Sequence, residues 1–302
     1  MKFVALLLLS ACAASARSTR PVSRDWQRHP AVVERDDIDE IYALSDPHGG
    51  VKELAALLAA NHLITGATWS GGDAMLVVVG DLIDKGPDSL GVIDLLRDLG
   101  PHVIVTMGNH EAEFFADPGN KKATSTGADS TGIVTQLGTA RAAAVAAASD
   151  PEGRGRWLMD LPFGVRIKKW FFAHAGNTNG DSVPALAKRL QVALERSGFG
   201  ADDITGADSI LEARNWYGTA GTAKRFADAL GVDHIAFGHD PGALGEHGHI
   251  VTSKHGILVK LDVEMGLHDR NAVTGGLLLH IKTKGADSAE ILDAKGTATP
   301  LR

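Results

Sequence analysis

Two apolar runs, each ending in a glycine and metal-ligand side chains, most constrain what this chain can fold into. Leu76–Val79 is followed by glycine and Asp81, and Val103–Met107 is followed by glycine, Asn109 and His110. A β-branched run that ends in glycine is typical of a buried parallel strand. Ligands of open α/β sheets bind at the carboxyl ends of such strands. Because carboxylate, amide and imidazole groups suit a divalent ion, the stretch predicts a metal site at a sheet edge.

The same strand, loop and helix pattern begins earlier in the chain. Ile41–Ser45 leads into a polar loop and the amphipathic segment Val51–Ala60, and a second amphipathic segment, Asp88–Leu99, separates the two runs described above. Three successive βα units predict a parallel α/β core. Further strands are expected at Val165–Ile167, Trp170–Ala173, His234–Phe237, Ile257–Leu261, Gly276–Ile281 and Ala289–Leu292, the last three antiparallel.

Metal-ligand side chains recur at five strand ends. A single histidine or aspartate in a turn has an ordinary structural explanation, but a set at successive strand ends indicates a functional site. Mixed carboxylate, amide and imidazole donors favour Mn, Fe or Zn over Ca or Mg, and a carboxylate can bridge two such ions, which together clamp a phosphoryl group. The set consists of Asp46, His48, Asp81, Asp84, Asn109, His110, His174 and His239.

Five sequence blocks together resemble the signature of the calcineurin-like metallophosphoesterases. The blocks are Asp46–Gly49, Gly80–Gly86, Gly108–Glu111, Phe172–Gly176 and Gly238–His239. Within that superfamily they resemble the phosphoprotein phosphatase branch, and most of all the bacterial Shewanella-like protein phosphatases. The resemblance implies an α/β fold, a four-layer αββα sandwich over residues 38–295, with residues 177–230 as a helical cap insertion.

The resemblance also implies a role for each residue of the set. Asp46, His48 and Asp81 would hold a first divalent ion, with Asp81 bridging to a second. Asn109, His174 and His239 would complete the second ion's site. A metal-bridging hydroxide would attack the phosphate, and His110, oriented and charged by Asp84, would protonate the leaving oxygen, since an imidazolium beside a carboxylate keeps its proton at neutral pH.

The expected substrate is a phosphomonoester, with phosphoprotein as the leading class, bound with help from Lys85, Arg214 and Tyr217. Lys85 stands where the related phosphatases carry arginine, so it offers a positive charge without a bidentate fork. Gly218 likewise replaces an arginine after the Trp-Tyr pair, a loss for which Arg214 could substitute. Two alternatives remain open: a hydrolase of dinucleoside polyphosphates or nucleotides, and a catalytically silent metal-binding protein.

The N-terminus predicts export. Lys2 precedes the apolar run Phe3–Leu9, which has the layout of a secretory signal and is too short to span a bilayer. The chain's single cysteine, Cys12, lies in a segment that resembles a bacterial lipobox. We therefore expect a lipoprotein signal at residues 1–11, lipidation of Cys12, and a tether over residues 12–37. The alternative is cleavage after Ala16 and secretion.

The charge pattern gives little support to a nucleic-acid partner. The formal net charge of the 302-residue chain is −7, and the sequence has no block of basic residues of the kind that binds a phosphate backbone. We expect a monomer in the periplasm or cell envelope that contacts the membrane only through its lipid anchor.

Overall fold

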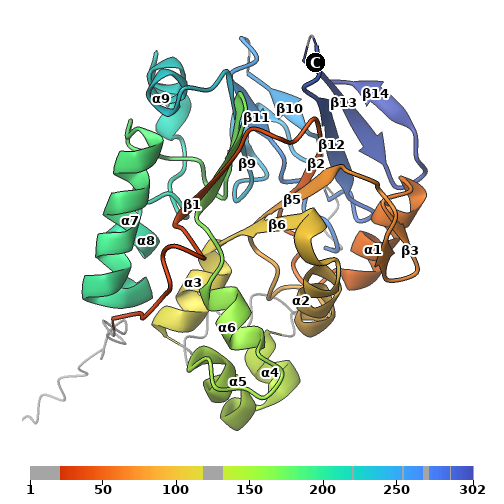
Figure 1. Ribbon diagram of the computed structural model, residues 1–302. Helices are drawn as coiled ribbons and strands as arrows, with labels where there is room; N and C mark the ends of the chain where they lie inside the picture. The colour runs from red at the N-terminus through yellow and green to blue at the C-terminus, as the bar shows by residue number, and fades with distance from the viewer. Residues whose placement is uncertain are drawn as a thin grey trace, which may run out of the picture.

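The computed structural model describes residues 21–117, 132–219, 221–253, 255–267, 272–285 and 287–301. Within them, two six-stranded sheets face each other (Figure 1). Sheet I runs in the order β14 (Ala298–Pro300), β13 (Ser288–Asp293), β12 (Leu277–Lys282), β2 (Glu40–Leu44), β5 (Met75–Val79) and β6 (Val103–Thr106). Sheet II runs in the order β1 (Val32–Arg35), β7 (Gly164–Ile167), β8 (Trp170–Ala173), β9 (His234–Phe237), β11 (Leu258–Lys260) and β10 (Val251–Thr252).

Helices cover the outer face of each sheet and complete the four-layer αββα sandwich. The helices α1 (Val51–Ala60) and α2 (Ser89–Asp98) lie on the sheet I side, and α7 (Val183–Ser197) and α9 (Thr222–Leu230) lie on the sheet II side (Figure 1). This architecture confirms the predicted fold class. The remaining elements are β3 (Ile64–Thr65), β4 (Thr68–Trp69), α3 (Asn109–Ala116), α4 (Ile133–Leu137), α5 (Thr139–Ala146), α6 (Arg154–Met159), α8 (Asp202–Thr205), η1 (Gly100–His102), η2 (Gly198–Gly200), η3 (Trp216–Gly218) and η4 (Ala243–Gly245).

The β5 strand explains why the sequence around it reads as one continuous apolar run. Met75, Val77 and Val79 belong to the core between the two sheets, whereas Leu76 and Val78 belong to the core beneath the helices. Successive strand residues point to opposite faces, so a strand covered on both faces has no polar alternation. Each such buried side chain contributes about 1.5–3 kcal/mol, which fixes the position of the loop that follows Val79.

The predicted parallel core is present in sheet I. Strand β5 pairs in parallel with β2 on one side and with β6 on the other. Their carboxyl ends therefore lie at one edge of the sheet, and the loops that carry Asp46, Asp81 and Asn109 leave from that edge. The antiparallel pairing of β12 with β13 also agrees with the sequence analysis.

The predicted tether and domain limits are wrong for the described part of the N-terminal segment. Strand β1 pairs in parallel with β7, and the buried guanidinium of Arg24 donates to the carbonyls of Leu161 and Pro30, both at 2.9 Å. At the other end, β14 extends sheet I beyond residue 295. Strand β1 was missed because its partner lies about 130 residues away, so no local pattern announces it. Cys12 and the predicted signal lie outside the described residues, and their roles stay predictions.

One further expectation needs correction. Strand β11 is antiparallel only to β10 and runs parallel to β9, because the chain goes from β9 to the edge strand β10 and then turns back into β11, which lies between them. The alanine-rich segment 133–148 forms two helices, because Gly138 between them has φ 75°. That conformation is accessible to glycine and cannot continue a right-handed helix.

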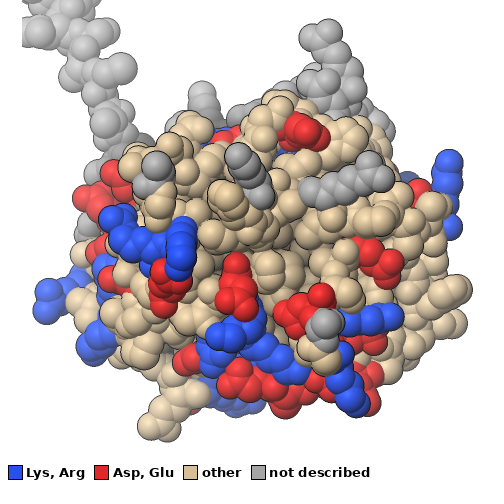
Figure 2. All heavy atoms as spheres, turned by 90° about the horizontal axis from the view of Figure 1, so that it is seen from above, with Lys and Arg blue, Asp and Glu red and all other residues tan. Residues whose placement is uncertain are grey.

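The predicted cap segment has two parts. Helices α7 and α9 serve as the outer layer of sheet II, whereas the loop around Arg214 and Trp216 reaches the carboxyl edge of the strands: the indole nitrogen of Trp216 donates to the Ala175 carbonyl at 2.8 Å. On the face shown in Figure 2, basic and acidic side chains are interspersed. Among the described helices, none combines the length and apolar character needed to cross a bilayer.

Candidate metal centre

The eight predicted site residues converge at the carboxyl edge of both sheets. Sheet I supplies six of them, from the loops after β2 and β5 and from the start of α3. Sheet II supplies two, from the loops after β8 and β9. All are buried except His110, which is half-buried. In chain order they are Asp46 and His48, Asp81 and Asp84, Asn109 and His110, His174, and His239.

Asp81 lies at the centre of the group. Its Oδ1 is 3.3 Å from Nε2 of His174, and its Oδ2 is 3.5 Å from Nε2 of His48. Donor atoms of His48, Asp81 and His110 lie within 4.8 Å of one another, and so do those of Asp46, Asp81 and His174. Asp81 is thus the carboxylate that two candidate metal-binding groups share, which is the geometry a bridging ligand needs.

The donors that we call the second subsite, namely Asn109, His174 and His239, contact one another. Oδ1 of Asn109 is 2.9 Å from Nε2 of His174 and 3.2 Å from Nδ1 of His239. We call Asp46, His48 and Asp81 the first subsite. The donor atoms do not separate cleanly into these two sets, because Asp46 lies within reach of both Asp81 and His174.

Backbone carbonyls fix which nitrogen each histidine presents to the centre. Nδ1 of His48 is 3.0 Å from the Ile83 carbonyl, and Nδ1 of His174 is 2.9 Å from the Val79 carbonyl. In His239 the order is reversed, since Nε2 is 3.2 Å from the Glu212 carbonyl. A carbonyl only accepts, so the nitrogen facing it carries the proton and the other keeps a lone pair for a ligand.

Glu111 is a residue to which the sequence analysis gave no role. Its buried carboxylate accepts hydrogen bonds from the backbone N–H groups of Asp81 at 3.0 Å, Leu82 at 2.8 Å, Ile83 at 3.2 Å and Gly108 at 2.9 Å. It therefore ties the loop after β5 to the start of α3. The acidic residue directly after the Asn-His pair was the available sequence signal for this role, but only the fold shows which backbone N–H groups it accepts.

The backbone of the site is strained. Positive φ is uncommon for residues other than glycine, and such outliers cluster at functional sites, where each costs about 1–3 kcal/mol. Gly238 adds a close approach, because a Cβ there would lie 2.2 Å from Oδ2 of Asp46. The site residues with positive φ are Asp46 (54°), His48 (39°), Asp81 (53°), Asp84 (66°), Lys85 (62°) and His239 (65°).

His110 and Asp84 form the predicted pair. Nδ1 of His110 is 3.0 Å from Oδ2 of Asp84, and Nε2 of His110 points toward Asp81, 3.8 Å from its Oδ2. Burial opposes protonation of His110, but Asp81 and the hydrogen bond to Asp84 outweigh it and raise the pKa of His110 to about 9. The imidazole is therefore held in its proton-bearing form near neutral pH.

The electrostatics of the centre favour a bound cation. Burial and the charge of Asp81 raise the pKa of Asp46 to about 8. Burial also raises the pKa of Asp262, which lies under the site and feels the charge of Asp46, well above its usual range. For His239, burial and the neighbouring His174 lower the pKa to about 2, so its imidazole is neutral. Crowded carboxylates beside neutral imidazoles are a donor set that fits divalent ions.

The three predicted substrate-binding residues lie on different sides of the centre. Lys85 reaches into it, with Nζ 2.8 Å from Nε2 of His48. Arg214 lies at the rim beside His239, where its guanidinium pairs with Asp240 at 3.2 Å and donates to the His239 carbonyl. Tyr217 packs its ring against Phe237, with centroids 5.6 Å apart.

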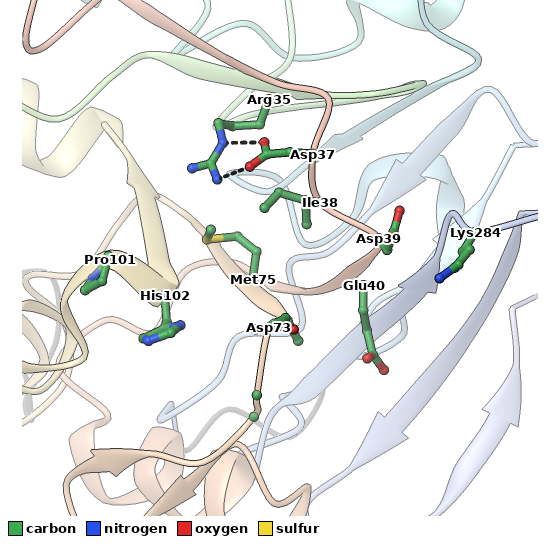
Figure 3. A pocket seen from close by; sticks show the side chains of 13 residues that line it. Arg35, Asp37, Ile38, Asp39, Glu40, Asp73, Met75, Pro101, His102 and Lys284 are labelled. Carbon is green, nitrogen blue, oxygen red and sulfur yellow. Dashed lines mark hydrogen bonds and ion pairs between the residues drawn. The ribbon is translucent and has the colours of Figure 1, made fainter.

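A charged hollow lies at the other end of the strands, away from the candidate centre. A cavity of 740 Å³ is lined by residues that precede β2, β5 and β6, among them Arg35, Asp37, Asp73 and His102 (Figure 3). These are the amino ends of the parallel strands, whereas the metal-ligand side chains follow the carboxyl ends. The cavity is therefore separate from the candidate centre.

Comparison with known proteins identifies the family of the chain. Residues 40–243 match the model of the calcineurin-like phosphoesterase family, a span that contains all eight site residues. The chain belongs to this family. It is 26% identical over 227 residues to a symmetrical bis(5'-nucleosyl)-tetraphosphatase of Nitrosococcus oceani, covering 69% of this chain and 74% of that protein. A protein of the same description from Pectobacterium atrosepticum is 37% identical over 75 residues, covering 25% of each chain.

Solved structures share the fold at lower identity. A cold-active protein-tyrosine phosphatase of a psychrophilic Shewanella species superposes with a TM-score of 0.67 at 18% identity, covering 90% of this chain and 82% of that one. A protein serine/threonine phosphatase from Saccharomyces cerevisiae gives a TM-score of 0.60 at 16% identity, covering 89% and 85%. A putative diadenosine tetraphosphatase gives 0.51 at 23% identity, covering 90% and 99%.

Proposed function

We propose that this protein is a metal-dependent phosphomonoesterase, with phosphorylated protein as its leading substrate class. The observation that carries the proposal is the position of Asp81, whose two carboxylate oxygens face different histidines of one buried donor set. In this proposal Asp46, His48 and Asp81 would hold one divalent ion, and Asn109, His174 and His239, together with Asp81, would hold a second. Bound ions of this kind polarise a phosphoryl group and lower the pKa of coordinated water.

The remaining residues bind the substrate or deliver a proton to the leaving group. His110 donates the proton from Nε2 to the leaving oxygen, and Asp84 at 3.0 Å keeps the ring oriented and charged. Lys85 and Arg214 bring positive charge to opposite sides of the phosphate, and Tyr217 lines the rim. Such a mechanism needs no covalent phosphoenzyme.

A second candidate is hydrolysis of dinucleoside polyphosphates. It is supported by the 26% identity to the tetraphosphatase of Nitrosococcus oceani. The wide coverage of the Shewanella protein-tyrosine phosphatase supports a shared fold and does not decide the substrate. The predicted export separates the candidates, because dinucleoside polyphosphates are cytosolic compounds.

A substrate panel tests the proposal. The purified, Mn²⁺-loaded chain is offered phosphoserine, phosphothreonine and phosphotyrosine peptides, phosphosugars and diadenosine tetraphosphate, and released phosphate or nucleotide is measured. We expect the highest kcat/KM for phosphopeptides. A clear preference for diadenosine tetraphosphate would replace the leading substrate class with the second candidate.

The Asp81→Asn variant tests whether the chain is an enzyme at all. Removing the shared carboxylate charge should lower aryl phosphate hydrolysis by about 10³-fold or more and lower the Mn content measured by elemental analysis. Equal activity of the variant and the wild type would support a catalytically silent metal-binding protein.

We also propose that the chain is an exported lipoprotein anchored through Cys12. The support is the apolar signal-like run followed by a single cysteine. In a bacterial host, fractionation should place the wild type with membranes and Cys12→Ala in the soluble fraction or in an uncleaved form. Identical fractionation and mass of the two proteins would contradict lipidation.

A further inference from the structure

Lys85 occupies the lone pair that the first subsite offers to a metal. Because Nδ1 of His48 faces the Ile83 carbonyl, it carries the ring proton, and Nε2 is an acceptor. Nζ of Lys85 lies 2.8 Å from that Nε2 and donates to it. An ion bonds a histidine nitrogen along the same lone pair, at about 2.0–2.1 Å for zinc. The ammonium and an ion therefore cannot engage His48 at the same time.

The charge around Lys85 explains why the ammonium lies there. Asp46, Asp81 and Asp262 are each at most 4% exposed, and the positive charge of Lys85 acts on all three carboxyl groups. Buried charges need a compensating partner. In the absence of an ion at the first subsite, Lys85 is that partner.

The second subsite is built differently. Asn109, His174 and His239 include no carboxylate and no ammonium group, and Asn109 contacts both histidines through its own side-chain oxygen. Arg214, at its rim, is engaged with Asp240 and a backbone carbonyl. An incoming ion at this subsite displaces no ammonium group from a donor nitrogen.

We propose that Lys85 is a tethered counter-ion that an ion must displace from the first subsite, so that the two subsites fill in a fixed order, the second before the first. The inference rests on the proposed metal-dependent function. The flexible four-carbon stem lets the ammonium leave His48 without a change of backbone. Once displaced, it stays beside the centre and is free to contact the substrate phosphate.

Calorimetric titration of the metal-free full chain with Mn²⁺ tests the order. We expect two binding events whose Kd values differ by at least about 10-fold, and Lys85→Met should tighten the weaker one by about 10–100-fold while changing the stronger by less than about threefold. Lys188→Met, on the exposed face of α7, is the control for net charge. His48→Ala should abolish the weaker event, and His239→Ala the stronger.

Other outcomes overturn the inference. Two equal sites in the wild type, or unchanged affinities in Lys85→Met, contradict it, and so does loss of the stronger event in His48→Ala. The His48→Ala titration needs no Lys85 variant, so it tests the filling order even if Lys85→Met and Lys85→Gln fail to fold. If two Mn²⁺ ions bind and phosphate is released while the Lys85 variants bind as the wild type does, only this inference fails. If the wild type binds no Mn²⁺, the proposed function fails with it.

Discussion

The two subsites differ in how their donors are held in place before any ion binds. In the second subsite, the side-chain oxygen of Asn109 lies 2.9 Å from Nε2 of His174 and 3.2 Å from Nδ1 of His239, so three metal-ligand atoms already converge on one point. In the first subsite, carboxylates crowd together and the Lys85 ammonium sits against His48. Similar donor types can therefore form a site whose donor atoms face no competing cation, or a site whose negative charge is already neutralised by a lysine. The local charge makes the difference.

The largest effect that sharpens this comparison is expected at His110. Nε2 of His110 lies near the same Asp81 oxygen that faces His48, so geometry alone would allow it to be a third donor of the first subsite. As the acid, His110→Asn should lower kcat by about 10²–10⁴-fold with metal content unchanged. Loss of one Mn²⁺ in elemental analysis would instead make His110 a ligand.

The next effect concerns the residue that joins the subsites. Glu111 accepts four backbone N–H groups, three in the loop of Asp81 and one that precedes Asn109. Glu111→Gln removes the charge and turns an amide donor toward those N–H groups, so we expect a loss of about 2–4 kcal/mol in urea unfolding. The exposed Glu195→Gln on α7 is the matched control, and an equally stable Glu111→Gln would show that the loop is held by other contacts.

A smaller change should break the first subsite selectively. A methyl group at Gly238 would approach Oδ2 of Asp46 to 2.2 Å and push that carboxylate out of place. We expect Gly238→Ala to weaken Mn²⁺ binding at the first subsite by about 10-fold and to alter the second by less. Equal weakening of both events in a titration would mean that Asp46 serves both ions, as its proximity to His174 would also permit.

The smallest effect is expected from Lys85→Arg. The charge is kept, but a guanidinium offers two parallel donors to a phosphate. The KM for an aryl phosphate should fall by about threefold, with kcat within a factor of two. A rise in KM would indicate that the arginine remains paired with buried carboxylates and does not reach the substrate.

The sequence analysis identified the donors because each follows an apolar strand that is easy to recognise, and parallel pairing of β2, β5 and β6 brings them together. It named Lys85 as a substrate-binding residue but did not predict its contact with His48, because that contact depends on a φ of 62° at Lys85 and on the position of the His48 ring. Asp262 was missed for a similar reason, since its burial beside Asp46 follows from long-range packing. No local sequence pattern predicts strand β1, because it is recognisable only through its pairing with the distant strand β7.

The origin of the donors in the two sheets has a mechanical consequence. The first subsite is built from sheet I alone, whereas the second takes Asn109 from sheet I and His174 and His239 from sheet II. An ion in the second subsite would therefore link the two sheets. Its complete donor set exists only after the two sheets have packed together. At 100 times its Kd such an ion adds about 2.7 kcal/mol to the unfolding free energy. A chelator should therefore lower the free energy of unfolding by weakening the contact between the sheets, and it should also abolish the proposed phosphoester hydrolysis.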